Sequence, residues 1–288
     1  QFAFEGCTGL TSIVIPKSVT SIGSGAFVYC NNLTSIVVEQ GNAIYDSRNN
    51  SNAVIKTATN SLVQGCKRTI IPNSVTSIGD SAFYACNGLT KFTIPKSVTS
   101  IDGGAFEGSG YYNTESNWEN GSLYISNCLM EASDAKNYTI KKGTRCIANY
   151  AFGNDTEAVT IPNSVKNIGF EAFDEYSHLK KVTYKGTTEQ WSKIKVEIGN
   201  KGLKDNIICC TDGGYSYKIS KSPISSIAAG NKSLKAKWTK AVGVAGYEVQ
   251  VAMNSTFTSN KKTVKIVKKG TTSATIKNLK AKKKYYVR

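Results

Sequence analysis

Cysteine and histidine are the side chains best suited to chemistry in this 288-residue sequence, which contains eight cysteines and one histidine, His178. A Cys-His or Ser-His relay needs a histidine as its base. His178 lies in "SHL", where related segments read "NNL", "NGL" and "TGL". Asn and Gly at one place are typical of a turn, so we expect His178 to be a turn residue. We therefore expect no catalytic residue.

The sequence also lacks the patterns that hold metals and phosphates. It contains no C-x-x-C pair, so zinc and thioredoxin chemistry are unsupported. No glycine-rich phosphate loop occurs, and nothing marks a catalytic pair among the 20 acidic residues. We expect no cofactor and no metal.

One thirteen-residue segment recurs through the chain. "IPKSVTSIGSGAF", residues 15–27, returns as "IPNSVTSIGDSAF", "IPKSVTSIDGGAF" and "IPNSVKNIGFEAF". Six Ala-Phe pairs follow one another at intervals of 23, 56, 23, 46 and 21 residues. A unit this short cannot bury its own apolar side, so the copies must stack into a solenoid. The phenylalanines of the six pairs are Phe4, Phe27, Phe83, Phe106, Phe152 and Phe173.

Each repeat reads as two short extended pieces and a turn. In "LTSIVIP" the apolar residues Leu10, Ile13 and Ile15 alternate with outward residues, which is typical of a strand with one buried side. Pro16 ends that strand, and "SVTSIG" forms the second piece. The fold class is therefore mainly β: a right-handed solenoid with a continuous parallel sheet, short turns or helical pieces on its other face, and all six phenylalanines in one buried column.

The two long intervals and the end of the solenoid depart from the repeat. Strand-like runs separated by Asn and Ser indicate hairpin inserts near residues 43–64 and 108–131. In "YKGTTEQWSKI" Thr188 is expected to cap a short helix whose Trp191 and Ile194 cover the open side of the last repeat, which is the last rung of the solenoid. We assign residues 1–210 to the solenoid, with a closing segment over 184–210.

Cysteines recur three residues after a repeat phenylalanine, at Cys7, Cys30 and Cys86. Other copies place Ser, Asp or Tyr there, so the position is not a metal ligand. We predict buried free thiols packed as small apolar groups. The alternative to free thiols is a disulfide between Cys7 and Cys30, because stacking of adjacent repeats would place their Cα atoms ~5 Å apart. The cysteines outside this column are Cys66, Cys128, Cys146 and the adjacent pair Cys209 and Cys210.

The outward strand positions, on the face expected to be concave, are rich in hydroxyls and basic side chains. These positions contain few acidic residues. One hypothesis is therefore that the face binds an anionic partner. The alternative is that it is an ordinary solvent-exposed sheet face. A second candidate is the aromatic group in the second insert, which could stack on sugars or fold back onto its hairpin. The candidate binding residues are Lys67, Arg68, Lys91, Lys136, Lys180 and Lys181 on the strands, and Tyr111, Tyr112 and Trp118 in the insert.

The composition changes after about residue 214. Residues 215–288 contain 17 Lys and Arg against one acid, Glu248, and carry the whole net charge of +16. Trp238 and Tyr247 lie in alternating segments, and Leu279 precedes Tyr285 by six residues. This pattern resembles a fibronectin type III sandwich over residues 218–288, a partial antiparallel sandwich truncated at the C-terminus and preceded by a linker over 211–217.

The repeat pattern L-x-x-I-x-I-P-x-x-V-x-x-I-G-x-x-A-F-x-x-C, over about residues 1–210, resembles the BspA-like leucine-rich repeats of bacterial surface proteins. The resemblance implies a non-catalytic, extracellular or cell-surface adhesion protein. Its partner would be a host or microbial surface protein, or an anionic glycan or cell-wall polymer. The alternative is an ancillary binding region of a large modular secreted enzyme. We expect no specific nucleic-acid binding, and no apolar run is long enough for a membrane span.

Overall fold

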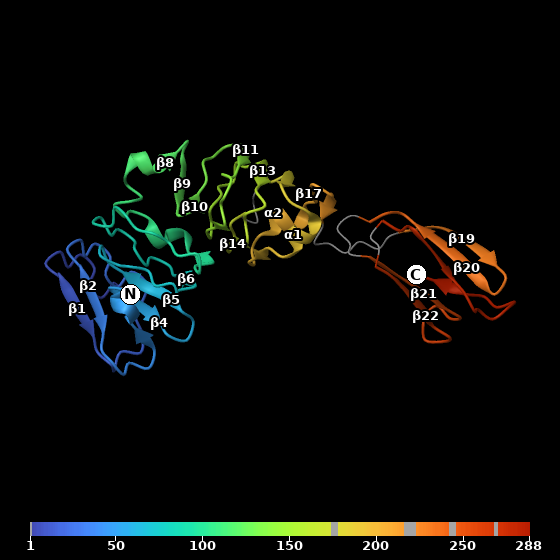
Figure 1. Ribbon diagram of the computed structural model, residues 1–288, viewed down its shortest axis with the longest axis horizontal. Helices are drawn as coiled ribbons and strands as arrows, with labels where there is room; N and C mark the ends of the chain where they lie inside the picture. Colours follow the sequence, from blue (N-terminus) through green and yellow to red (C-terminus); the bar gives the residue numbers. More distant parts are fainter. Residues whose placement is uncertain (1, 174–177, 216–222, 242–245, 268–269) are drawn as a thin grey trace.

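The computed structural model consists of a region built from stacked short strands and a C-terminal pair of antiparallel sheets (Figure 1). It describes residues 2–173, 178–215, 223–241, 246–267 and 270–288. Among these residues no helix is long and apolar enough to span a membrane. The mainly β fold class is confirmed.

The first extended pieces of the repeats form parallel ladders. Ser12 lies opposite Ser35 at the N-terminal end, and Ala158 lies opposite Lys181 further on. Within residues 35–38 and 158–161 the inward residues are buried and the outward ones are half-buried or exposed, as the alternation predicts. The strands are β1 (Ser12–Ile15) and β2 (Ser35–Val38), then β11 (Asn137–Thr139), β13 (Ala158–Ile161), β15 (Lys181–Tyr184), β17 (Ile208–Cys210) and the antiparallel β18 (Gly213–Tyr215). β18 lies within the segment expected to be a linker, 211–217.

The second extended pieces form parallel ladders of their own. Their hydrogen bonds run rung to rung, with Ile78 opposite Ile101 and Ile147 opposite Ile168. The strands are β5 (Ser61–Gly65), β6 (Ser77–Ile78) and β7 (Ser100–Ile101), then β10 (Cys128–Glu131), β12 (Cys146–Ile147), β14 (Asn167–Ile168) and β16 (Lys195–Val196).

Two antiparallel three-stranded units lie where the inserts were predicted, and both are built alike. A residue with positive φ, Asn60 or Asn127, precedes the last strand of each unit. That last strand pairs in parallel with the next repeat, Leu62 with Ile78 in one unit and Leu129 with Ile147 in the other. The first unit is β3 (Tyr45–Asp46), the 3-10 turn η1 (Arg48–Asn50), β4 (Ala53–Lys56) and β5; the second is η3 (Glu115–Asn117), β8 (Trp118–Glu119), β9 (Ser122–Ile125) and β10.

The prediction of one continuous parallel sheet is wrong. Residues 67–71 and 90–94, which the structure describes, form no strand between β2 and β11. Ile70 N donates to Ser51 O at 3.0 Å, and Ile94 N donates to Ser126 Oγ at 3.0 Å. The acceptors belong to the two insert regions, so insert residues occupy the neighbouring places in the stack and interrupt the ladder.

The repeat phenylalanines form three stacked pairs instead of one buried column. The ring centroids of Phe83 and Phe106, which ends the 3-10 turn η2 (Gly103–Phe106), are 5.0 Å apart. Phe152 and Phe173 are 4.4 Å apart, and both inserts interrupt the column. Five of the six rings are buried, but Phe4, which stacks on Phe27 at 5.2 Å, is 39% exposed.

A short helix closes the repeat-built region, as predicted, but its cap is one residue earlier. Helix α1 (Thr188–Ser192) begins after Thr187, whose hydroxyl accepts from Gln190 N while Gln190 Oε1 accepts from Thr187 N. Trp191 is fully buried and meets the Tyr184 ring edge-on at 5.0 Å. A second helix, α2 (Lys201–Asp205), follows.

Two three-stranded antiparallel sheets form the C-terminal part. Their strand orders are β19-β20-β23 and β22-β21-β24, and one apolar cluster joins residues of both sheets, including Trp238 and Val251. The bounds are β19 (Ile224–Gly230), β20 (Ser233–Trp238), β21 (Tyr247–Ala252), β22 (Lys262–Ile266), β23 (Ser273–Ile276) and β24 (Tyr286–Val287).

Cys7, Cys30 and Cys86 are free thiols, but the prediction that they are buried is wrong for Cys7, which is exposed, and Cys86 is only half-buried. The sequence pattern predicted no bridge among the other cysteines, and one is present. Cys128 and Cys146 form a disulfide, with their Cα atoms 4.7 Å apart. The two residues lie opposite each other in the parallel pair β10–β12. Adjacent rungs thus bring equivalent residues within bridging distance.

Candidate binding face

The outward residues of the first-strand ladders form the candidate site, which we call the ladder face. It comprises β1, β2, β11, β13 and β15 together with the irregular segments 67–71 and 90–94. Its N-terminal part is apolar, because Val14, Val37 and Ile70 are 62%, 44% and 70% exposed. Serine and threonine side chains flank these residues.

The C-terminal part of the ladder face is polar and regular. Thr160 lies between Thr139 and Thr183 in register on three adjacent strands. Glu157, at the edge of this array, pairs with Lys180 at 3.1 Å. The hydrogen bond and charge of Lys180 lower the pKa of Glu157, with Lys136 adding a smaller effect. Glu157 therefore offsets part of the positive charge here, while Lys136 and Lys181 are exposed.

Three further cations lie between the two inserts. Arg68 and Lys91 are exposed, and Lys67 is half-buried with its stem against Gly88, where an added Cβ would come within 2.7 Å of Lys67 Cδ. No ion pair joins any of these three to a carboxylate of the described residues. They therefore have charge available for a partner.

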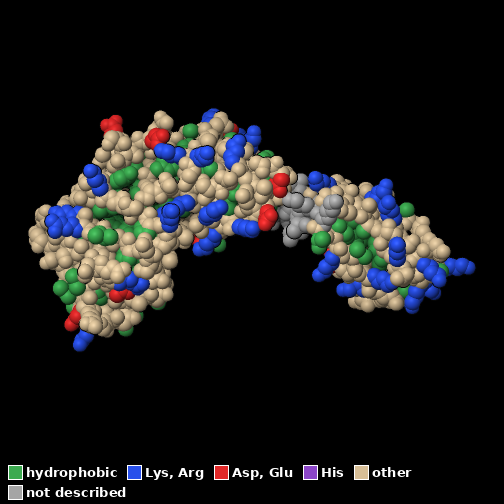
Figure 2. Space-filling model, in the orientation of Figure 1, with side chains coloured by type: hydrophobic (Ala, Val, Ile, Leu, Met, Phe, Trp, Pro, Cys, Tyr) green, Lys and Arg blue, Asp and Glu red, His purple; other side chains and the backbone are tan. Residues whose placement is uncertain are grey.

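Lys and Arg side chains lie along the repeat-built region in the view of Figure 2, and the acidic side chains visible there are fewer. The C-terminal part in the same view carries many Lys and Arg side chains. The two parts therefore both present positive charge, although only the C-terminal part has a large net charge.

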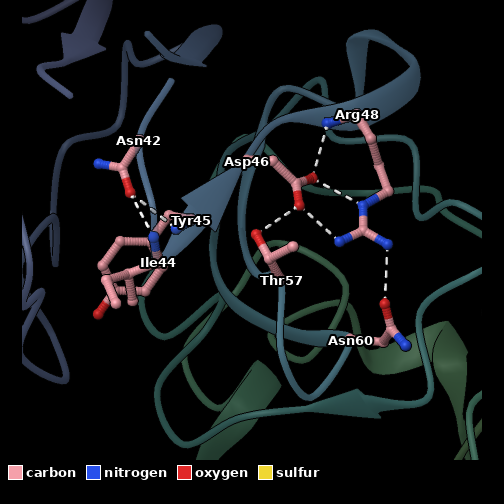
Figure 3. Close-up of polar contacts among 7 residues, drawn as sticks. All are labelled: Asn42, Ile44, Tyr45, Asp46, Arg48, Thr57 and Asn60. Atoms are coloured by element: carbon pink, nitrogen blue, oxygen red, sulfur yellow. Dashed lines mark hydrogen bonds and ion pairs between the residues drawn. The ribbon is translucent and has the colours of Figure 1, made fainter. Parts of the chain in front are cut away.

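A polar network that the sequence analysis missed fixes the first insert (Figure 3). Asp46 accepts hydrogen bonds from the Arg48 guanidinium and from Thr57 Oγ1 at 2.9 Å, and Arg48 Nη1 donates to Asn60 Oδ1 at 2.8 Å. Burial alone would raise the pKa of Asp46, but the hydrogen bonds from Arg48 and Thr57 together lower it. Arg48 is thus neutralised internally, unlike Arg68. The only sequence signal was the Asp-x-Arg spacing in "YDSR".

The insert aromatics pack against the insert itself and against Phe92 of the preceding repeat. Tyr111 packs edge-on against Phe92 at 5.3 Å, and Trp118 packs edge-on against Tyr112 at 5.0 Å. Trp118 Nε1 donates to Tyr112 O at 2.6 Å, and Tyr112 Oη donates to Glu131 Oε2 at 3.0 Å. Burial, followed by Glu131, raises the pKa of Tyr112 to about 12. All three aromatic residues are half-buried, as is Lys67, whereas the other candidate cations are exposed.

The remaining candidates for chemistry are dispersed. His178 is exposed, and its Nδ1 lies 3.2 Å from Asn154 O. Within the described ranges no group of three or more His, Cys, Asp or Glu side chains could hold a metal ion.

The repeats match a known family. Residues 1–109, 63–180 and 154–195 match the model described as BspA type leucine rich repeat region, in six copies. Together these ranges span residues 1–195, which is more than half of the chain. The chain belongs to this family.

This BspA-type chain is similar to several solved bacterial structures, and no match is found among curated proteins. A leucine-rich repeat protein from Eubacterium ventriosum is 21% identical, with a TM-score of 0.34, over 61% of this chain and 42% of that one. A leucine rich cell surface protein from Faecalibacterium prausnitzii is 23% identical, with a TM-score of 0.29, over 66% and 52%. The pneumococcal vaccine antigen PcpA is 14% identical, with a TM-score of 0.33, over 70% and 56%. This chain thus spans about half the length of these proteins.

Proposed function

We propose that this BspA-type chain is a non-catalytic adhesion protein of the bacterial cell surface, and that its ladder face binds an anionic glycan or cell-wall polymer. Membership of the repeat family supports the surface role. The observation that carries the proposal is the set of cations without an ion-pair partner among the described residues, Lys67, Arg68 and Lys91, continued by the exposed Lys136 and Lys181. A polymer with regularly spaced sulfates or phosphates could contact several of them at once.

The face is otherwise suited to an extended ligand. Thr139, Thr160 and Thr183 lie in register on adjacent strands, and their hydroxyls can donate to sulfate or phosphate oxygens beside Lys181. An acidic patch on a host or microbial protein would meet the same cations, so it is the competing outcome in the test below.

We further propose that residues 218–288 form a fibronectin type III-like sandwich that spaces the solenoid, residues 1–210, from its attachment. The strand orders β19-β20-β23 and β22-β21-β24 support this, since the fold packs two antiparallel sheets in this way. Trp238 is buried on the second strand, close to Tyr247. Tyr285 Oη accepts from Lys280 N at 2.9 Å, which is the bond of a tyrosine corner.

The test compares two variants of the full chain that lose the same charge. One replaces Lys67, Arg68, Lys91 and Lys181 by Ser; the other replaces the exposed Lys235, Lys237, Lys265 and Lys277 by Ser. Each lowers the net charge from +16 to +12. With a sulfated polysaccharide as the probe, we expect the first variant to bind about tenfold more weakly than the second, from four exposed contacts of about 0.3–0.5 kcal/mol each.

Equal losses in the two variants would mean that attraction follows total charge, and the proposal would be wrong. Unchanged polysaccharide binding in both, together with binding of an acidic surface protein that only the first variant loses, would identify the partner as a protein.

A further inference from the structure

The turns that contain Cys7 and Cys30 are equivalent and lie on adjacent rungs. Leu10 N donates to Cys7 O at 3.0 Å, and Leu33 N donates to Cys30 O at 3.0 Å. Cys7 N donates to Phe4 O, and Cys30 N donates to Phe27 O in the same way. The two cysteines therefore occupy the same place in consecutive copies of one turn.

Rung-to-rung contacts hold these two turns against each other. Gly6 N donates to Val28 O at 2.9 Å, and Phe4 N donates to Ala26 O at 2.9 Å. Cys30 Sγ lies 2.9 Å from Phe4 O, the same carbonyl that accepts from Cys7 N at 3.2 Å. The Cys30 thiol thus already lies against the backbone of the Cys7 turn.

The same solenoid contains a bridge of this kind. Cys128 and Cys146 lie opposite each other on adjacent rungs and are bonded with a Cα separation of 4.7 Å. Equivalent residues of neighbouring rungs can therefore be joined in this fold without separating the rungs. Cys7 and Cys30 are both free thiols in the structure, so the pair is present in its reduced form.

The two thiols differ in solvent exposure, as the two cysteines of a redox pair do. Cys7 is exposed and open to an oxidant, whereas Cys30 is buried beside it. Burial raises the pKa of Cys30, and the backbone amide of Cys7 lowers it in part. Cys30 therefore has the smaller thiolate fraction and is the slower of the two thiols to attack an oxidant from solution.

The other thiols near this end are poorer candidates. Cys66, expected to lie outside the cysteine column, belongs to the same kind of turn, because Thr69 N donates to Cys66 O at 3.0 Å. It is buried, and burial raises the pKa of the neighbouring Cys86 to about 12. Neither thiol has the exposure of Cys7.

We propose that Cys7 and Cys30 are a redox pair that closes into a cross-rung disulfide on meeting a disulfide oxidant. The Cys7 thiolate attacks one sulfur of the oxidant R–S–S–R and releases RS⁻, which leaves a mixed disulfide on Cys7. Cys30 then loses its proton to solvent and attacks Cys7 Sγ, which releases the second RS⁻. Two electrons pass to the oxidant, whose two thiolates take up the two protons.

The test uses the full chain in buffers of reduced and oxidised glutathione, followed by non-reducing tryptic mapping. Cleavage after Lys17 and Arg48 separates the two residues into peptides 1–17 and 18–48. After oxidation we expect these peptides joined, with loss of two hydrogens. The joined peptide should persist in Cys86→Ser and be lost in Cys7→Ser, an exposed substitution that leaves the core unchanged.

Two results would overturn the proposal. One is that Cys7 is recovered only as a mixed disulfide with glutathione, under conditions in which the peptides that contain Cys128 and Cys146 are joined. The other is peptide 18–48 joined to the peptide that contains Cys66 in place of peptide 1–17. A higher midpoint of thermal unfolding for oxidised wild type than for oxidised Cys7→Ser would support the cross-rung bridge by a second readout.

Discussion

At the scale of single residues, burial separates the phenylalanines that stabilise the repeats from the one at the edge. Phe83 is 1% exposed and stacks on Phe106, whereas Phe4 is 39% exposed. We predict that Phe83→Ala lowers the free energy of unfolding by about 3–5 kcal/mol, the usual loss for emptying a buried aromatic site. Phe4→Ala should cost well under half of that. Denaturant unfolding measures both, and equal losses would contradict the assignment.

A second residue-scale prediction concerns the Asp46 network. Asp46→Asn should lower the free energy of unfolding at pH 7 by about 1–2 kcal/mol, because it removes charge-assisted hydrogen bonds from Arg48. The folded-state pKa of Asp46 is lowered, so its contribution is fully present above the unfolded pKa of about 3.9 and is lost as the pH falls through the lowered value. Unfolding curves of the two proteins should therefore converge in acid. A difference between the two proteins that does not shrink as the pH falls through the acid range would contradict this account.

At the scale of elements, the sequence pattern predicted the repeats well and their continuity poorly. Strand positions, the closing helix and the two inserts follow from alternation and turn residues that are local in the chain. The break between β2 and β11 depends on Ser51 and Ser126, whose contacts with Ile70 and Ile94 come from the three-dimensional path of the inserts. The Cys128–Cys146 bridge escaped prediction for a related reason: those cysteines share no spacing from a repeat phenylalanine, and only the pairing of β10 with β12 brings them together.

The cap of helix α1 gives an element-scale prediction. Thr187→Ala should lower the free energy of unfolding by about 1 kcal/mol, because the N3 amide of Gln190 loses its acceptor. Thr187→Ser keeps the hydroxyl and should cost little. If thermal unfolding does not distinguish the two variants, the capping box does not stabilise the closing segment.

The Cys128–Cys146 disulfide gives a second prediction at the scale of elements. Replacing Cys128 and Cys146 together by Ser should lower the free energy of unfolding by about 3 kcal/mol, since the bridge closes a loop with a sequence separation of 18 residues. Reduction of the wild-type protein should produce a similar loss. The Cys86→Ser variant, which retains the bridge, serves as the control, and a double variant as stable as this control would show that the bridge does not form in solution.

At the scale of the whole molecule, charge is divided unevenly between residues 1–214 and residues 215–288. Residues 1–214 balance 19 basic against 19 acidic side chains, so their unpaired cations are a local feature of the ladder face. Residues 215–288 carry 17 basic side chains against one acid and would attract any polyanion. Binding strength alone therefore cannot locate the partner, and the measurement must report on individual side chains.

The most direct measurement is lysine acetylation of the full chain with and without the sulfated polysaccharide, read by mass spectrometry at moderate salt. Screening over ~8 Å at physiological ionic strength weakens diffuse attraction and leaves direct contacts visible. We predict slower acetylation at Lys67, Lys91 and Lys181, and little change at Lys235 and Lys237. Protection confined to the lysines of residues 223–288, or uniform along the chain, would contradict the claim that the ladder face is the binding site.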